Sequence, residues 1–368
     1  MNTSIRALAR LTGVSPSTVS RALKGNGRIS PKIREKIRKA AQKAGYQVLP
    51  LFSQALSLAR QPKTARYRET LAFILEFPTE NGPDYQKATQ AGAEERAASL
   101  AYKLEPFILT GGPSQHRRWS NIFRNRGIRG LIIMSRLVHR QPRLLFDWEQ
   151  FATVEIGRTL WSPLNLHRVE SAEYPKILEV VHLLKKVGYR RIGMAIEPQQ
   201  NQHQYGVYYA AFLLMQQKLP PAQRIPILAL EGGWNEKNFY RWMRKYKPDV
   251  LITHRHMEII VWLHKLGMQI PADISLFRMD VRGDDPPGPH QAYACSGLRR
   301  DYFTTGRRAV EMVSTLLEGG ELGLVGNPMC WQVGGLWLAG KTLSKPITEY
   351  ISPEGYLRTL WPRSALRT

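Results

Sequence analysis

The sequence is poor in acidic residues and in cysteine. Its 368 residues include 53 Lys or Arg against 29 Asp or Glu, which gives a formal net charge of +24 at pH 7. Such an excess of positive charge favours a polyanionic partner. The two cysteines, Cys295 and Cys330, belong to no metal-binding motif and predict buried free thiols; a disulfide between them is the less favoured alternative.

Signatures of several other protein classes are missing. No apolar run approaches the length of a membrane helix, and the basic N-terminus leads directly into amphipathic sequence without the apolar segment of a signal peptide. We therefore expect a cytoplasmic protein, associated with the bacterial nucleoid and not with a membrane. The sequence has no GxGxxG after a strand, no P-loop and no GxSxG, so we expect no enzyme, no cofactor and no bound metal.

Residues 1–46 contain the start and stop signals of three short helices. Ser residues that can cap a helix precede each one, two of them followed by a Pro at the first helical position, and Gly residues end the first and third. These positions are Ser4, Gly13, Ser15–Pro16, Ser30–Pro31 and Gly45. Apolar residues at helical spacing predict a small shared core of Ile5, Leu8, Val14, Val19 and Leu23, with Ile33, Ile37, Ala40 and Ala41 of the third helix facing inward.

This three-helix segment is strongly basic. It carries eleven Lys or Arg and one acid, Glu35, for a net charge of +10, which leaves +14 of the total on the rest of the chain. A tight turn before a second helix with a short polar face predicts a helix-turn-helix that binds DNA. The alternative is a basic, solvated bundle with no role in nucleic-acid binding.

The run GVSPSTVSRALKGNGRIS, followed by a helix ending in AGY, resembles the DNA-binding headpiece of the LacI/GalR (lac repressor) family of bacterial transcriptional regulators. Ser17 and Arg21 are expected to contact base edges in the major groove, with Arg21 a bidentate donor to guanine. Pro16 and Thr18 are expected to contact methyl groups or phosphates alongside. The residues expected to fix the backbone register are Ser4, Ser15, Ser20, Asn26 and Arg28, and Tyr46 is also expected to contact DNA.

Residues 47–68 form a linker that occupies the place of this family's hinge helix. The resemblance implies that an apolar side chain enters the minor groove here, and counting from Tyr46 places Ala55 or Leu56 at that position. The usual Pro-Asn start of the hinge is missing. A plain flexible tether is the alternative.

From Glu69 onward, buried strands alternate with helices, which predicts parallel, doubly wound sheets in two Rossmann-like lobes with a ligand cleft between them. IPILAL (225–230) and CWQVGGLWL (330–338) are each expected to form one strand. The expected boundaries are 1–46 for the headpiece, 47–68 for the hinge, 69–165 with about 297–326 for the N-terminal lobe, 166–296 with about 327–342 for the C-terminal lobe, and 343–368 for a loosely attached tail.

This core resembles the effector-binding core of the same family, which is similar to periplasmic sugar-binding proteins. The resemblance is carried by GYRRIG, by PDVLI…LHKLGMQIPADISLFRMD and by GRRAVEMVSTLLEG. It implies that Asp280 matches the family's effector-binding aspartate, although a turn-capping role is equally open. His203 stands where the family often has an arginine, and Trp234, beside Gly232–Gly233, is a candidate for packing against a sugar.

These expectations combine into a dimeric regulator, acting as a repressor, that binds a pseudo-palindromic double-stranded DNA operator. A small molecule, possibly a sugar, is expected to modulate it from the interlobe cleft. Two other function classes stay open. One is an architectural DNA-binding protein that needs no effector, and the other is a sugar-binding or sugar-modifying α/β protein with an accessory basic domain.

Overall fold

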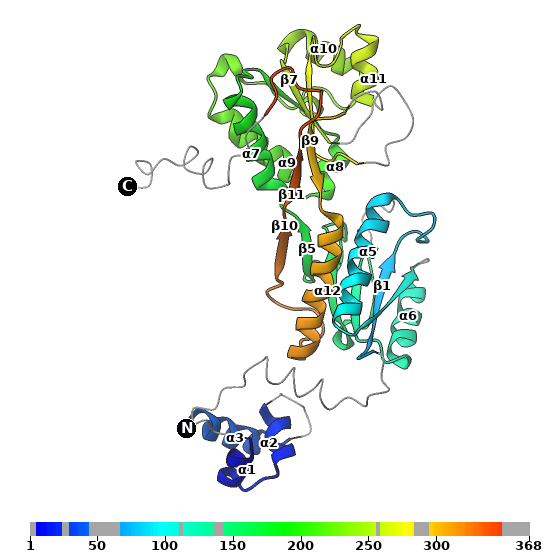
Figure 1. Ribbon diagram of the computed structural model, residues 1–368, viewed down its shortest axis with the longest axis vertical. Coiled ribbons are helices and arrows are strands. Elements are labelled where there is room, and N and C mark those ends of the chain that lie inside the picture. The colour runs from blue at the N-terminus through cyan, green and yellow to red at the C-terminus, as the bar shows by residue number, and fades with distance from the viewer. Residues whose placement is uncertain are drawn as a thin grey trace.

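The computed structural model describes residues 5–23, 29–43, 67–109, 113–135, 143–254, 258–282 and 294–347. Figure 1 shows a small helical headpiece and two α/β lobes. The headpiece contains α1 (Ile5–Thr12), α2 (Pro16–Leu23) and α3 (Pro31–Lys43). The predicted caps are confirmed for α2 and α3, because Ser15 Oγ accepts from Thr18 N at 3.2 Å and Ser30 Oγ accepts from Ile33 N at 3.5 Å. Gly13 ends α1 at φ +70°. Ser4 and Gly45 lie outside the described residues.

The headpiece core is centred on Leu8, Val19, Ala22 and Ile37, which are fully buried, and Val14 packs partly against it. The prediction was wrong for Ile33, whose side chain is 38% exposed. Ile33 lies in the first turn of α3, whereas the contacts of α3 with the buried cluster begin one turn later, at Ile37. The three helices therefore form a small independent core of their own.

The first lobe is built on a six-stranded, fully parallel sheet, as predicted. From edge to edge its strands are β10 (Cys330–Val333), β5 (His167–Ser171), β4 (Ala152–Ile156), β3 (Gly130–Ile133), β1 (Thr70–Leu75) and β2 (Lys103–Ile108). Its helices are α5 (Asp84–Ser99), α6 (Pro113–Asn125) and α12 (Tyr302–Gly319), with a 3-10 turn η1 (Trp148–Gln150). In Figure 1, α5 and α12 lie side by side over this sheet.

The second lobe is built on a five-stranded sheet, parallel except for the edge pair β11–β9. Its strands are β11 (Gly335–Leu338), β9 (Gly297–Arg300), β8 (Ser275–Arg278), β7 (Val250–Thr253) and β6 (Ile192–Ala195). Its helices are α7 (Glu173–Lys186), α8 (Pro198–His203), α9 (Val207–Gln217), α10 (Glu236–Tyr246) and α11 (Glu258–Lys265), with 3-10 turns η2 (Pro221–Gln223) and η3 (Leu228–Leu230).

Within the described residues of the core, the chain passes between the two sheets three times, each time a few residues later than the expected boundary. β5 lies in the first sheet although 166–296 was assigned to the second lobe, β9 lies in the second sheet, and β10 returns to the first. β5 went unrecognised because its charged side chains pair inside the lobe. Arg168 pairs with Glu155, and Glu170 pairs with Arg158.

Three further expectations are corrected. IPILAL forms the turn η3 rather than a strand, since Pro226 has no N–H for a strand ladder and its carbonyl accepts from Trp242 Nε1. CWQVGGLWL is divided at Gly334 into β10 and β11, which join different sheets. Both cysteines are free, but Cys330 is exposed and only Cys295 is buried.

The segment expected to begin a loose tail is instead attached to the second lobe over residues 343–347. Leu343 and Ile347 are buried in its main cluster, and Lys345 N donates to Tyr189 Oη at 2.9 Å. Residues 348–368 lie outside the described part of the chain.

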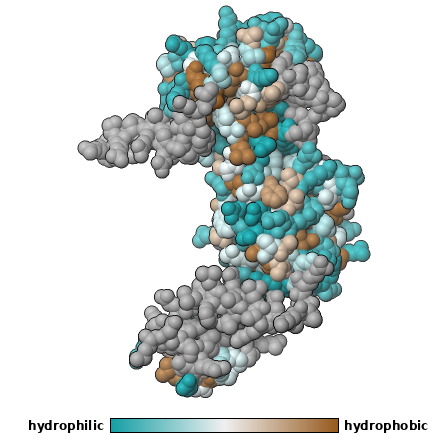
Figure 2. Space-filling view, viewed as in Figure 1, coloured by the Kyte–Doolittle hydropathy of each residue, from teal (hydrophilic) through white to brown (hydrophobic). Residues whose placement is uncertain are grey.

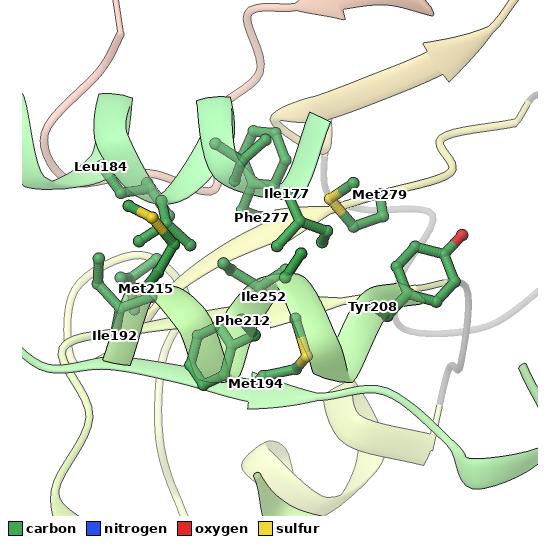
Figure 3. Packing of buried hydrophobic residues seen from close by; sticks show 14 of the residues in the cluster. Ile177, Leu184, Ile192, Met194, Tyr208, Phe212, Met215, Ile252, Phe277 and Met279 are labelled. Atoms are coloured by element: carbon green, nitrogen blue, oxygen red, sulfur yellow. The ribbon is translucent and has the colours of Figure 1, made fainter. Parts of the chain in front are cut away.

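The main core of the second lobe is packed between α7, α9 and the sheet. Figure 3 shows Ile177 beside Phe277 in this cluster, with Phe212 and Met194 on its other side. Tyr208 lies at its edge with its hydroxyl pointing away from the cluster. The ring of Tyr208 is therefore part of the core, while its hydroxyl is available to the neighbouring polar groups.

In the first lobe, α5 and α12 approach until their backbones touch. A Cβ at Gly92 would lie 1.9 Å from the carbonyl oxygen of Phe303, and a Cβ at Gly306 would lie 1.9 Å from that of Thr89. Because both obstacles are backbone atoms, no side-chain rotation could make room for a larger residue. The two glycines therefore fix the spacing between the helices.

We expect Gly306→Ala to lower the free energy of unfolding by about 2–3 kcal/mol, because a methyl group there forces α12 away from α5. Gly319→Ala, in the last turn of the same helix, is the matched control. A Cβ at Gly319 meets nothing within 4 Å, so this change is expected to be neutral or to stabilise by up to about 1 kcal/mol through helix propensity. Urea unfolding followed by circular dichroism measures both. Equal effects at the two positions would contradict the close-approach argument.

Among the helices that the structure describes, none combines the length and the apolar character required to span a bilayer. On the face of the two lobes that Figure 2 shows, hydrophilic residues predominate, and hydrophobic residues are visible near the junction of the lobes.

Candidate DNA-binding helix and interlobe cleft

The second headpiece helix presents its first turn to solvent. Pro16 and Ser17 are exposed and Thr18 is half-buried. The hydroxyl of Ser15 is 2.8 Å from the hydroxyls of both Ser17 and Thr18, so the cap residue orders this turn. Val19 anchors the opposite face of the helix in the core.

The structure says less about the other residues that are predicted to contact DNA. Ser20 and Arg21 are placed in α2, but the description does not extend to their side chains. The remaining predicted positions, Ser4, Asn26, Arg28, Tyr46, Ala55 and Leu56, lie outside the described residues. All of these positions therefore stay predictions.

A cleft of about 690 Å³ lies between the two lobes. Its walls come from the carboxyl ends of strands in both sheets, the place where open α/β folds bind ligands. The first lobe contributes Met134, Ser135, Gly157, Glu170 and Tyr302, and the second contributes His203, His254, Trp262, Arg282 and Arg300, among others. The volume is suitable for a small metabolite.

Asp280 lies behind this cleft rather than on its surface. Its carboxylate is fully buried and accepts a hydrogen bond from Arg282 Nε at 2.7 Å. The hydroxyl of Tyr302 lies 3.1 Å from both carboxylate oxygens. Burial alone would raise the pKa of Asp280, but Arg300, Arg282 and His254 hold it well below its usual range. The aspartate is therefore ionised and already paired within the protein.

Arg282 is held from several sides. Its guanidinium lies 4.6 Å from the ring centroid of Tyr85 and 5.4 Å from that of Tyr302, and its Nη2 donates to Tyr302 Oη at 2.9 Å. Tyr85 and Tyr302 belong to the core of the first lobe, whereas Arg282 follows β8 of the second. The Asp280–Arg282 pair therefore joins the two lobes.

Arg300, at the end of β9, forms a second buried ion pair. Its Nη2 is 2.9 Å from Glu173 Oε1 and 2.6 Å from the hydroxyl of Tyr208. Burial alone would lower the pKa of Arg300, but Glu173 and the neighbouring tyrosines raise it, so the guanidinium stays charged. For Tyr208, burial raises the pKa of the hydroxyl, which therefore stays neutral.

One wall of the cleft is organised by Glu155, at the end of β4. Its Oε1 accepts from the backbone N–H groups of Thr159 and Leu160, both at 2.9 Å, and its Oε2 accepts from Arg168 Nε at 2.7 Å. These contacts shape the loop that contains the cleft residues Gly157 and Thr159. Glu170 accepts from Arg158 Nη2 at 2.8 Å and from Gln332 Nε2 at 3.1 Å.

Tyr205 crosses from the second lobe to this wall. Its hydroxyl donates to the carbonyl of Leu160 at 3.1 Å, and Arg158 lies 5.7 Å from its ring centroid. Tyr205 has φ +49°, and Gly206 follows at +81°, so the chain turns sharply between α8 and α9. This turn presents the ring to the first lobe.

The predicted effector residues are only partly brought together. His203 lines the cleft, and its buried Nδ1 has no hydrogen-bond partner among the residues that the structure describes; burial lowers the pKa of this imidazole. Trp234 packs on Trp262, with ring centroids 5.6 Å apart, and Trp262 is the one of the two that lines the cleft. Asp280 is separated from the cleft by Arg282. The described residues contain no group of three or more His, Cys, Asp or Glu that could hold a metal ion.

Several cleft residues were missed by the sequence reasoning. Arg282 lies two residues after Asp280, and this short spacing was the available signal. Tyr85 and Arg300 of the cleft lining, and Tyr205, which bonds to Leu160 of the opposite lobe, had no signal in the sequence, since their roles depend on contacts between distant parts of the chain.

Comparisons with known proteins agree with this architecture. Residues 4–48 match the model of bacterial regulatory proteins of the lacI family, and residues 181–323 match that of the periplasmic binding protein-like domain. The chain is 23% identical over 328 residues to the HTH-type transcriptional regulator KdgR of Bacillus subtilis (strain 168), covering 86% of this chain and 92% of that protein.

Solved structures share the fold. The lac repressor dimer bound to operator and the anti-inducer ONPF is 16% identical, with a TM-score of 0.51, over 94% of this chain and 100% of that one. The LacI family regulator CCPA from Weissella paramesenteroides with bound glucose is 13% identical, with a TM-score of 0.53, over 75% of this chain and 98% of that one.

A helix-turn-helix headpiece followed by a two-lobed, periplasmic-binding-protein-like core defines a class of DNA-binding transcriptional regulator. Within that class, this chain belongs to the LacI/GalR family.

Proposed function

We propose that the protein is a dimeric, operator-specific repressor whose DNA affinity is set by a small molecule bound in the interlobe cleft. The supporting observation is the combination, in one chain, of an exposed, capped helix on a basic headpiece and a cleft whose two walls belong to different lobes. A dimer places two headpieces on the two halves of a pseudo-palindromic operator.

The ligand acts through the relative position of the lobes. A molecule that binds one arrangement more tightly than another shifts the population toward it. That shift changes the spacing between the headpieces of the dimer and therefore the affinity for the operator. A carbohydrate-like ligand is supported by relatives whose structures contain cellobiose or glucose.

Selection of preferred sites from random DNA, with the purified full-length protein at near-physiological salt, tests the DNA-binding part of this proposal. An enriched inverted repeat is the expected result. The absence of enrichment, with binding that fades smoothly as salt rises, would contradict operator recognition and indicate only electrostatic attraction to phosphates.

One observation favours a second candidate, an effector-independent DNA-binding protein. Asp280 is occupied by the protein's own Arg282, so the cleft already contains the partner that an external ligand would supply. A screen of small molecules distinguishes the two candidates. Only an effector-dependent repressor changes its affinity for the selected operator when a ligand is added.

A further inference from the structure

We propose that the cleft binds an anionic ligand, a small polyhydroxy compound with a carboxylate or phosphate group, through the guanidinium groups of Arg282 and Arg300. This inference rests on the proposed function of the cleft and specifies the chemical class of its ligand.

The first argument is that the protein uses its own carboxylates internally. Asp280 accepts from Arg282 and Tyr302, Glu155 accepts from Arg168 and two backbone N–H groups, and Glu170 accepts from Arg158 and Gln332. A neutral sugar is usually held by carboxylates that accept from its hydroxyls. In these three carboxylates that accepting capacity is largely taken, and Glu258, at the start of α11, is the exposed carboxylate among the described residues of the cleft lining.

The second argument is the order of charges, counted from the core outward. Asp280 and Glu173 are 0% and 2% exposed and do not line the cleft. Arg282 and Arg300 lie in front of them, with side chains 9% and 14% exposed, and both line the cleft. On this side of the cleft, a ligand therefore meets guanidinium before carboxylate, and an anion there would complete an alternating series of charges.

The third argument is unused donor capacity. A guanidinium has five N–H donors. Among the described residues, the buried Nε of Arg300 has no hydrogen-bond partner, and Arg282 contacts its partners through Nε and Nη2. A carboxylate or phosphate oxygen is the acceptor that best fits such donors, since charge-assisted hydrogen bonds are the strongest that a guanidinium makes.

The two arginines are also held in position before a ligand arrives. Arg282 is stacked against Tyr85 and Tyr302, and Arg300 is fixed by Tyr208 and Glu173. The orientation of the donors is therefore fixed in advance, which reduces the entropy lost on binding. The remaining lining includes the apolar Val169, Val261 and Trp262, suited to the carbon skeleton of a small metabolite.

Isothermal titration calorimetry of the full-length protein tests this inference with ligand pairs that differ in charge. The pairs are D-gluconate with D-sorbitol, D-glucuronate with D-glucose, and D-glucose 6-phosphate with D-glucose. We expect the acid of at least one pair to bind about tenfold or more tightly than its neutral partner. Comparison of glucuronate with glucose 6-phosphate distinguishes a carboxylate from a phosphate ligand.

Variants assign the effect to the two arginines. Arg282→Gln and Arg300→Gln should each weaken binding of the acid by about tenfold or more, and Arg282→Lys should weaken it less, because it keeps the charge but not the planar fork. Arg190→Gln is the matched control, since Arg190 is an exposed arginine of the same lobe that lines neither the cleft nor the smaller cavity beside Arg282 and Arg300. Thermal unfolding of each variant verifies that it is folded.

Tighter or equal binding of the neutral partner in every pair, or no binding of any of the three acids, would overturn the inference. The wild-type arm gives this answer even where an arginine variant fails to fold. An enriched operator without acid binding would leave the proposed function standing and the inference wrong. If binding of the acid depends on Arg282 but no operator is enriched, the inference about the ligand stands and operator recognition is contradicted.

Discussion

Arg21→Ala is expected to lower affinity for the selected operator by about 30-fold to 10⁴-fold, because a bidentate contact to guanine contributes about 1–3 kcal/mol in each of two half-sites. Affinity for random DNA should fall only a few-fold, since each headpiece loses a single positive charge. α2 places position 21 one turn after the exposed Ser17, on the helix whose opposite face is anchored by Val19. Fluorescence anisotropy with operator and scrambled duplexes measures both affinities.

Lys39→Ala is the control for this prediction. Lys39 lies on α3, is highly exposed and pairs with Glu35 at 3.0 Å. Removing it takes away the same charge without touching α2, so binding to operator and to scrambled DNA should weaken by the same small factor. An Arg21→Ala variant that also loses the two affinities in equal proportion would contradict base recognition by Arg21.

The headpiece illustrates what local sequence signals can predict. Ser15 and Ser30 cap the helices that they were predicted to cap, because a capping interaction depends on residues three positions apart. Ile33 was misplaced by the same local reasoning. Helical periodicity assigned it to the inner face of α3, but burial depends on how far the neighbouring helices extend.

In the core, periodicity located the apolar strands but missed β5. Strands such as β1 and β3 are buried apolar runs that any helix-covered sheet requires. β5 contains Arg168 and Glu170, whose burial is possible only because Glu155 and Arg158 pair with them. Such a strand cannot be recognised until the partners of its charges are known.

The cleft was predictable as a location but not as a chemical environment. The alternation of strands and helices places strand ends from both lobes around one space. Asp280 was identified from the resemblance, yet its burial behind Arg282 depends on Tyr85 and Tyr302, which are more than 200 residues apart in the chain. The order of positive and negative side chains around the ligand site therefore could not be predicted from the sequence.

The largest effect on stability is expected at the ion pair that supports the cleft wall. Arg168→Ala should lower the free energy of unfolding by about 3–5 kcal/mol, because it leaves the fully buried carboxylate of Glu155 without its cation. Urea unfolding at neutral pH measures the loss. The Glu155→Gln/Arg168→Ala double variant is the control, because the amide oxygen still accepts from Thr159 and Leu160 while the buried charge is gone. It should be more stable than Arg168→Ala alone.

The same pair predicts how that loss depends on pH. Burial raises the pKa of Glu155, and Arg168 and the backbone N–H groups of Leu160 and Thr159 only partly oppose this. The folded protein therefore keeps this proton at pH values where the unfolded chain has lost it, so this group lowers stability as pH rises from the unfolded pKa through the raised folded one. Without Arg168 the pKa rises further, and the deficit of Arg168→Ala should be smaller at about pH 5 than at about pH 8. A deficit that is the same at both pH values would mean that lost packing, rather than the uncompensated charge, destabilises the variant.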